Sequence, residues 1–169
     1  MEKLSSVSFF CPAYYDEDNI SLVVRNADEL LKKVAEKYEI IVVEDCSPDK
    51  TGEVADELAK EYKNMRVIRH KKNKDYGGAL KSGFENSKYD YVMYTDGDNQ
   101  YNVFEFNRLI PLLNDCDVVA GYVTKKAASK KRKLQSEIYN LCILFLFGFY
   151  FRDINCSMKI FKRRVLDYI

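Results

Sequence analysis

The sequence predicts an α/β protein in which helices flank a mainly parallel sheet. Short apolar runs alternate along the 169 residues with longer segments of helical character. The run Glu39–Val43 (EIIVV) is continuously apolar after its first residue, which is typical of a strand buried on both faces of a parallel sheet. A chain of this length that is 47% hydrophobic can bury a substantial core. We therefore expect residues 1–169 to form a single domain.

The first half of the chain predicts two strand and helix pairs. Val7–Cys11 (VSFFC) is the first expected strand, and a helix is expected over Ile20–Tyr38. Glu39–Val43 forms the second expected strand, and Thr51–Tyr62 the helix after it. The loop between them contains Ser47 and Asp49, and either side chain could cap that helix by accepting its free N–H groups.

The second half continues the same alternation of strands and helices. Three further strands and two further helices are expected, in the order Met65–Arg69 (strand), Gly78–Asn86 (helix), Tyr91–Thr95 (strand), Val103–Leu113 (helix) and Asp117–Ala120 (strand).

Composition excludes several classes of protein. With 27 Lys and Arg against 26 Asp and Glu, the net charge is +1, so no overall charge points to nucleic acid. The spacing of the five cysteines fits no metal motif, which favours a reducing compartment and mostly buried thiols. The N-terminal residues lack the apolar stretch of a signal peptide. The longest uncharged apolar run, Ile138–Phe151, is shorter than the roughly 18 residues that a spanning helix needs.

Ligands of open α/β sheets bind outside the carboxyl ends of the strands. The loops expected at that edge are Pro12–Asn19, Glu44–Lys50, His70–Gly78, Asp96–Tyr101 and Gly121–Lys126, and four of them carry carboxylates. The only histidine, His70, stands at the start of one of these loops, where we interpret it as a polar loop residue.

The loop after YVMYT contains the pattern Asp96-Gly97-Asp98. Side chains two residues apart on an extended chain face the same way, and Gly97 lets the backbone bend close to a ligand. Two carboxylates on one face suit Mg²⁺ or Mn²⁺, particularly when a diphosphate supplies further oxygens, and Gln100 could add a neutral oxygen. A solvated acidic turn or a phosphatase-type acidic motif would also explain the pattern Asp96-Gly97-Asp98.

A second acidic pair, Glu44-Asp45, follows the buried strand Glu39–Val43. Helix capping explains Ser47 and Asp49 in the same loop. Capping does not explain two adjacent carboxylates at the end of a buried strand, so Glu44 and Asp45 are candidates for a ligand site.

Five segments together carry a family resemblance. FFCPAYYDEDNI, IIVVEDCSPDKT, DYGGALKSGF, YVMYTDGDNQY and DINCSMKIFKRRVL occur in that order and cover nearly the whole chain. Their order and spacing resemble those of family-2 glycosyltransferases of the GT-A fold. The resemblance is strongest to the branch of dolichyl-phosphate mannose synthase and other polyprenyl-phosphate glycosyltransferases. It implies a GT-A, Rossmann-like sheet with a nucleotide-sugar-binding part over residues 1–121 and an acceptor- and membrane-facing part over residues 122–169.

The resemblance also assigns roles to residues. It implies contacts to the nucleotide sugar from Pro12, Tyr14, Asp16, Val43, Asp45, Gly78, Asp96 and Gly97. It implies a divalent metal, Mn²⁺ or Mg²⁺, bound through Asp96, Asp98 and Gln100. Catalytic roles are implied for Asp96, Asp98 and Asp153. Gly77 stands beside Gly78 where a helix would open near the diphosphate.

The chain departs from the family pattern at three positions. Asp16 stands where the family has Glu, and Glu44 stands where it has the first Asp of a pair. Val123 occupies the position of an Arg that reaches phosphate in the family. Lys125 or Lys126 could substitute there, although a lysine is a point charge and lacks the bidentate fork of arginine.

Residues 122–133 are rich in lysine and contain no acid, and the apolar run Ile138–Phe151 follows. One interpretation is a solvated basic loop before a core helix. The other is a membrane-surface element with basic residues toward anionic headgroups and apolar residues in the interface. The resemblance implies that Arg132 and Ser136, four residues apart, bind the phosphate of a polyprenyl acceptor.

These inferences predict a metal-dependent, inverting transfer of a sugar from a nucleotide-diphosphate sugar, with GDP-mannose or a UDP-hexose as donor, to a polyprenyl phosphate. The expected location is the cytoplasmic face of a membrane, with peripheral attachment and no nucleic-acid partner. One alternative is a family-2 transferase with a saccharide acceptor, for which Asp153 would be the first candidate base. The other is a non-catalytic nucleotide-sugar-binding module.

Overall fold

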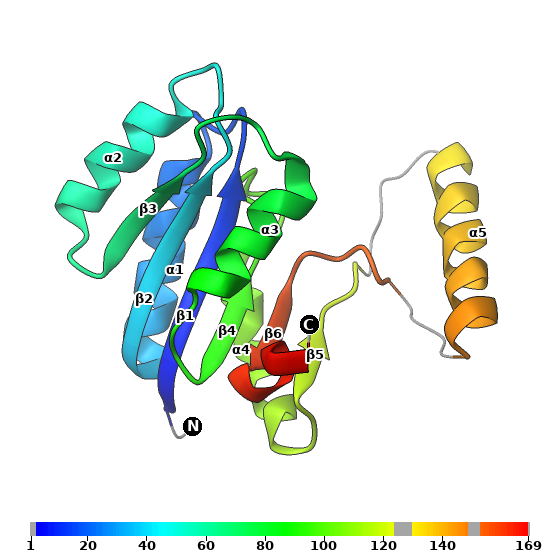
Figure 1. Ribbon diagram of the computed structural model, residues 1–169. Coiled ribbons are helices and arrows are strands. Elements are labelled where there is room, and N and C mark those ends of the chain that lie inside the picture. The colour runs from blue at the N-terminus through cyan, green and yellow to red at the C-terminus, as the bar shows by residue number, and fades with distance from the viewer. Residues whose placement is uncertain (1–2, 124–129, 149–152, 169) are drawn as a thin grey trace.

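The computed structural model describes residues 3–123, 130–148 and 153–168, and within α5 it describes side chains from residue 138 onward. These residues contain a six-stranded sheet in the order β3-β2-β1-β4-β6-β5 (Figure 1). The strands are β1 (Leu4–Ala13), β2 (Ala35–Glu44), β3 (Met65–Arg69), β4 (Tyr91–Tyr94), β5 (Val118–Ala120) and β6 (Lys159–Lys162). The predicted mainly parallel α/β architecture is confirmed.

Strand pairing is parallel in the first four strands and antiparallel at the last two. β1 lies between β2 and β4 and is parallel to both, with Phe9 opposite Ile40 and Met93. β3 pairs in parallel with β2. β6 runs antiparallel to both β4 and β5 and separates them. The carboxyl ends of β1 to β4 therefore meet at one edge, at the top in Figure 1.

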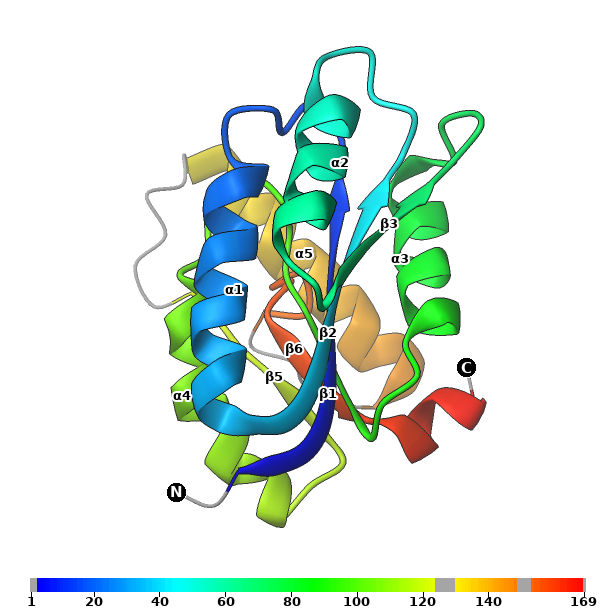
Figure 2. The ribbon, with the colours of Figure 1, turned by 90° about the vertical axis from the view of Figure 1, so that its left-hand side faces the viewer.

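Helices cover both faces of the sheet. α1 (Ile20–Val34) and α2 (Thr51–Glu61) pack on one face, and α3 (Asp75–Asn86) packs on the other against β1 and β2 (Figure 2). The segment after β4 forms a short helical stretch, η1 (Val103–Glu105), α4 (Phe106–Leu109) and η2 (Ile110–Asn114), on the face of α1.

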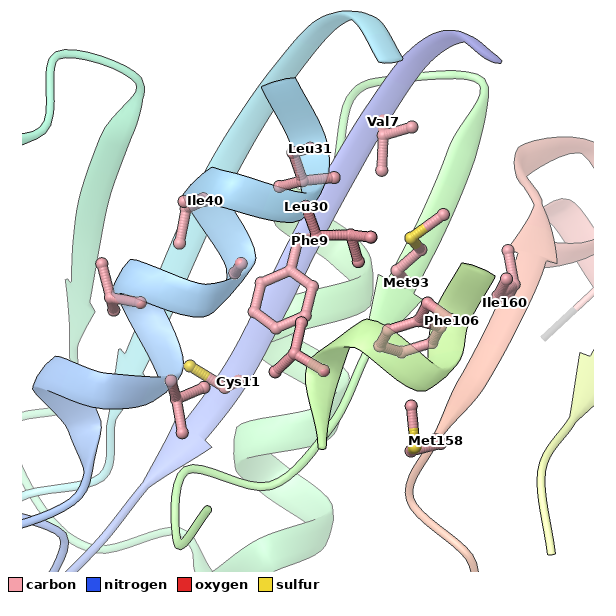
Figure 3. Close-up of a cluster of buried hydrophobic side chains, with 14 of the residues drawn as sticks. Val7, Phe9, Cys11, Leu30, Leu31, Ile40, Met93, Phe106, Met158 and Ile160 are labelled. Atoms are coloured by element: carbon pink, nitrogen blue, oxygen red, sulfur yellow. The ribbon is translucent and has the colours of Figure 1, made fainter. Parts of the chain in front are cut away.

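The larger core cluster lies between the sheet and α1 (Figure 3). Phe9 of β1 and Phe106 of α4 meet edge to face, with ring centroids 6.3 Å apart. Leu30, Leu31 and Met93 are fully buried around them. Each such side chain contributes roughly 1.5–3 kcal/mol when it leaves water, so this cluster holds the layers together.

The smaller core cluster lies between the sheet and α3. Phe10 meets Phe84 edge to face and stacks on Tyr94, with ring centroids 5.0 and 5.2 Å apart. A Cβ atom on Gly83 would overlap the ring of Phe10. Glycine is therefore what lets α3 approach β1 this closely.

Most predicted boundaries shift in the structure, and three helices differ most from their prediction. The first helix ends at Val34 rather than Tyr38, because Ala35 and Tyr38 pair with Leu4 and Val7 in the sheet. Tertiary pairing here overrides the helical preference of the sequence. α3 begins three residues earlier than predicted, at Asp75. The helix predicted over Val103–Leu113 is broken into the short elements η1, α4 and η2, with a proline in the first turn of η2.

The C-terminal region contains elements that the strand and helix patterns did not predict. β6 and the 3-10 helix η3 (Arg163–Tyr168) were not expected. α5 (Lys130–Phe147) begins before the predicted apolar run and includes most of it. Phe145 is 89% exposed and Leu146 is 70% exposed. Among the described residues, no helix combines the length and the apolar character needed to span a bilayer.

The prediction of mostly buried thiols is wrong. All five cysteines are free, but only Cys11 and Cys156 are buried, while Cys46, Cys116 and Cys142 are exposed. The three exposed cysteines lie in a loop, beside η2 and on α5, away from the two clusters of buried apolar side chains.

Candidate active site

A cavity of about 370 Å³ lies at the carboxyl edge of β1, β2 and β4. Loops after the first four strands contribute to it, as the topology predicts. Its lining residues are Pro12, Ala13, Tyr14, Asp16, Asp45, Asn73, Asp75, Tyr76, Ala79, Asp96, Gly97 and Asp98. Six of the predicted nucleotide-binding residues are thus together at one cavity, namely Pro12, Tyr14, Asp16, Asp45, Asp96 and Gly97.

Each of these four loops contains one non-glycine residue in the left-handed backbone region. Tyr15, Cys46, Asp75 and Asn99 have φ angles of 60°, 57°, 61° and 57°. Such conformations cost of order 1–3 kcal/mol each and cluster at functional sites in proteins. Each of the four loops has one such residue, so backbone strain is concentrated at this edge of the sheet, where it fixes the conformation of the loops.

Gly97 brings the loop after β4 against the loop after β1. Its N–H donates to the carbonyl oxygen of Pro12 at 3.1 Å. A Cβ atom on Gly97 would lie 2.7 Å from that oxygen and 2.9 Å from Oδ2 of Asp16. Only glycine fits this approach, so Gly97 sets the position of Asp96 and Asp98 relative to β1.

The cavity is strongly acidic. Five carboxylates line it, and no Lys, Arg or His is among the described lining residues. Burial, with a further contribution from the charges of Asp98, Asp49 and Asp96, raises the pKa of Asp16 to about 6 against the opposing effect of the hydrogen bond from the Tyr14 N–H. An anionic ligand such as a diphosphate can enter this cavity only together with a cation.

Asp96 and Asp98 suit a cation whose remaining ligands are oxygens of the substrate. Asp96 Oδ1 accepts a hydrogen bond from the Tyr76 hydroxyl at 2.8 Å, and Asp98 Oδ1 accepts one from the Gln100 N–H at 3.0 Å. Over the described ranges, no group of three or more His, Cys, Asp or Glu side chains forms a closed metal cage. Mg²⁺-type ions commonly bind through one or two carboxylates plus substrate phosphates and water, so the residues fit such an ion.

Asp45 is held by the buried side chain of His70. Nδ1 of His70 lies 2.5 Å from Oδ1 of Asp45, and Nε2 of His70 lies 2.8 Å from Oγ of Ser82. His70 lies in the loop directly after β3, as interpreted, but its side chain is buried, with 6% exposed, which the sequence did not indicate. The sequence signal that could have found it is its position directly after β3, at the same edge as Asp45.

Glu44 and Asp45 are adjacent in sequence, but their side chains make contacts in different places. Glu44 accepts a hydrogen bond from the Ser47 N–H at 2.5 Å and pairs with Arg69, whose Nε lies 3.3 Å away. Ser47 in turn accepts from the N–H of Tyr15 at 2.8 Å, which ties the loops after β1 and β2 together. Glu44 therefore stabilises the loops, while Asp45 faces the cavity.

Three residues that the resemblance assigned to the donor or the metal lie off this cavity. Val43 is fully buried in the cluster of Phe10 and Ala79 and does not line the cavity. Gly78 lies in the first turn of α3 beside the lining residues but is not one of them. Gln100 lines a second cavity of about 510 Å³ instead.

The second cavity lies on the other side of the Asp96–Tyr101 loop. Apolar side chains from the segment after β4 and from the start of β6 line much of it, including Leu109, Leu112 and Met158. Gly121, Tyr122 and Val123 complete it after β5. The two cavities thus share one loop, with Asp98 on one side and Gln100 on the other.

Asp153 and Lys159 lie close to this loop. Asp153 is buried and accepts a hydrogen bond from the N–H of Val123 at 3.3 Å. The ammonium of Lys159 donates to the Tyr94 hydroxyl and to the carbonyl oxygen of Ile154, both at 3.1 Å. Burial lowers the pKa of Lys159, while the charges of Cys156, Asp96 and Asp153 oppose that shift.

Lys159 is a candidate functional residue that the sequence analysis did not name. The signal that could have found it is its place in the segment DINCSMKIFKRRVL, one of the five that carry the resemblance. The side chains of Arg132 and Ser136, and the residues Lys125 and Lys126, lie outside the described part of the structure.

Known proteins resemble this chain in sequence and in fold. The family model described as glycosyl transferase family 2 matches residues 8–169. A relative from Photorhabdus laumondii, named undecaprenyl-phosphate 4-deoxy-4-formamido-L-arabinose transferase, is 28% identical over 169 residues. The match covers 98% of this chain and 52% of that relative, so the chain spans about half of the relative's length.

Solved structures share the fold. Glucosyl-3-phosphoglycerate synthase from Mycobacterium tuberculosis, solved with Mn²⁺, UDP-glucose and phosphoglyceric acid, has a TM-score of 0.72 at 17% identity and matches 95% of this chain and 58% of its own. A mannosyltransferase from Pyrobaculum calidifontis, solved with GDP-mannose and Mn²⁺, has a TM-score of 0.65 at 16% identity and matches 96% and 46%. The GT-A fold is confirmed, and the family match over nearly the whole chain shows that this protein belongs to glycosyl transferase family 2.

Proposed function

We propose that this protein transfers a sugar from a nucleotide-diphosphate sugar to a polyprenyl phosphate, with Mn²⁺ or Mg²⁺ at the donor diphosphate. The observation that carries the proposal is the acidic cavity in which Asp45 and Tyr14 lie together with Asp96 and Asp98. The Photorhabdus relative is named for transfer to undecaprenyl phosphate, which supports the acceptor class.

We propose one orientation for the donor, with its base at Asp45 and Tyr14 and its diphosphate at Asp96 and Asp98. Asp45 and the half-exposed ring of Tyr14 offer a hydrogen-bond acceptor and an aromatic face to a base. Asp96 and Asp98 would hold the divalent ion, and that ion would supply positive charge to stabilise the leaving diphosphate. Lys159 adds a positive charge near Asp96 and compensates for the missing arginine at Val123.

The acceptor needs little activation. A phosphate monoester has a second pKa of about 6, so it is already an anionic nucleophile at neutral pH. The protein then mainly positions two substrates. Direct attack on the anomeric carbon inverts its configuration. Asp153, buried beside the loop after β5, orients the reacting groups.

We place the acceptor on the side of the second cavity. Its apolar lining suits the first isoprene units of a lipid, and the loop shared with the donor cavity brings the two substrates together. The exposed apolar side chains on α5 and the lysines at its start would lie at a membrane surface on the cytoplasmic side. Arg132 and Ser136 of α5 would then bind the acceptor phosphate.

A transfer assay with organic extraction tests the proposal. The protein is incubated with labelled nucleotide sugars, undecaprenyl phosphate and Mn²⁺, and label is measured in the organic phase. We expect lipid-linked product, at least a 100-fold loss in Asp98→Asn, and no change in Asp115→Asn, a matched substitution of an exposed aspartate that lines neither cavity.

Three outcomes would contradict parts of the proposal. Full activity of Asp98→Asn would overturn the metal assignment. If the label stays in the aqueous phase as a saccharide product, the acceptor is a saccharide and not a polyprenyl phosphate. Donor binding without transfer to any acceptor would leave a nucleotide-sugar-binding module, which is the alternative that Val123 in place of arginine favours.

A further inference from the structure

A buried chain of three polar side chains reaches from the donor cavity to α3. It runs from Asp45 after β2, through His70 after β3, to Ser82 on α3. Asp45, His70 and Ser82 are 3%, 6% and 9% exposed, respectively. Of the three, only Asp45 lines the donor cavity.

The partners of His70 determine where its proton lies. A carboxylate can only accept hydrogen bonds, so the Nδ1 atom facing Asp45 carries the hydrogen. In the neutral imidazole Nε2 is then an acceptor, and the hydroxyl of Ser82 donates to it. Both ring nitrogens have a partner, which holds the imidazole plane in one orientation.

The same contacts occupy one oxygen of Asp45. Oδ1 accepts from Nδ1 of His70 at 2.5 Å and from the N–H of Lys74 at 2.9 Å. Two donors use both lone pairs of that oxygen. Over the described residues, no hydrogen bond to Oδ2 is formed. Asp45 therefore presents a single accepting oxygen to a ligand in the cavity.

We propose that His70 is a positioning residue that restricts Asp45 to one acceptor oxygen and thereby selects a uracil nucleotide over a guanine nucleotide. The proposal rests on the donor site described above. Uracil has one ring N–H, flanked by two carbonyl groups, which a single oxygen satisfies. Guanine presents a ring N–H and an adjacent amino group, which together match the two oxygens of a free carboxylate.

The expected discrimination follows from the unmade hydrogen bond. When Oδ1 is occupied, guanine leaves one N–H without a partner against Asp45, and an unsatisfied donor of this kind weakens binding by about tenfold or more. If His70 no longer donated to Oδ1, that oxygen would be available to a ligand, and guanine would lose its disadvantage.

Calorimetric titration of UDP and GDP in the presence of Mn²⁺ tests the proposal. The wild-type protein is expected to bind UDP at least tenfold more tightly than GDP. His70→Leu removes one of the two donors to Oδ1 and leaves only the N–H of Lys74. This frees one lone pair of that oxygen, so we expect the ratio of the two affinities to fall about tenfold. His70→Asn, whose amide N–H lies near the position of Nδ1, is the conservative control and should keep the ratio close to wild type.

A second variant covers the case in which His70→Leu does not fold. Ser82→Ala removes the partner of Nε2 and lets the imidazole rotate, so the ratio should fall in the same direction by a smaller factor. Thermal melting of each variant establishes that it is folded before binding is measured.

The results separate this inference from the proposed function. GDP binding as tight as or tighter than UDP binding in the wild type overturns the inference and leaves the donor site intact. An unchanged ratio in folded His70→Leu also overturns it. Binding of neither nucleotide overturns the donor site itself and, with it, this inference.

Discussion

Replacing Gly97 with alanine tests how the donor loop is built. The added Cβ would lie 2.7 Å from the Pro12 carbonyl oxygen and 2.9 Å from Oδ2 of Asp16. Both neighbours are fixed, because Pro12 is paired in the sheet and Asp16 is held by the N–H of Tyr14 at 2.9 Å. The loop after β4 must therefore move away, and the Gly97 to Pro12 hydrogen bond is lost.

The size of the effect has two parts. Forcing one extra methyl group into a packed site costs about 1–3 kcal/mol. The lost hydrogen bond adds about 0.5–1.5 kcal/mol. We expect the free energy of unfolding to fall by roughly 2–4 kcal/mol. The larger consequence concerns the site, since displacing Asp96 and Asp98 by about 1 Å is enough to reduce transfer by about 100-fold.

Gly77→Ala is the matched control. Nothing lies within 4 Å of a Cβ atom built on Gly77, which is in the first turn of α3. Alanine in a helix is more favourable than glycine by about 0.5–1 kcal/mol, so this variant should be neutral or slightly more stable. Urea unfolding measures stability, and titration of nucleotide with Mn²⁺ measures the site. A Gly97→Ala protein that matches Gly77→Ala in both assays would refute the reasoning.

Two further predictions concern the core and the acidic cavity. Gly83→Ala should lower the free energy of unfolding by about 1–3 kcal/mol, because the new methyl group displaces the stacked ring of Phe10. Urea unfolding measures this, and stability equal to that of the wild type would contradict the packing argument. The pKa of Asp16 is raised from 3.8 to about 6, so the metal-free folded state holds this proton more tightly than the unfolded state. The contribution of Asp16 to stability therefore falls as pH rises between about 4 and 6. In Asp16→Asn the melting temperature should decline less steeply over that interval than in the wild type. A decline as steep as in the wild type would contradict the raised pKa of Asp16.

The strands β1 to β5 were predictable because each contains a short run of apolar residues that can be recognised without knowledge of its partners in the sheet. Lys159–Lys162 gave no such signal, since only Ile160 and Phe161 are apolar and both are buried by strands that come much earlier in the chain. Likewise, Ala35–Tyr38 has helical character and becomes a strand only through pairing with β1.

The place of a candidate residue in the fold was predictable where it follows closely after a strand. Asp45, Asp96 and Asp98 directly follow β2 and β4, so topology alone brings them to one edge. The burial of His70 was not predictable, because it depends on partners 25 and 12 residues away. Val43 was transferred from the resemblance, and its side chain points instead into the core cluster beside α3.

The antiparallel strand β6 has a consequence for how the chain folds. β4 pairs with β1 on one side and with β6 on the other, and β5 has only β6 as a partner among the described strands. Until Lys159–Lys162 has been synthesised, one edge of β4 offers unpaired N–H and C=O groups, the type of edge at which chains aggregate. Closing the sheet is thus a late, long-range step, and any fragment that ends before β6 keeps the exposed edge.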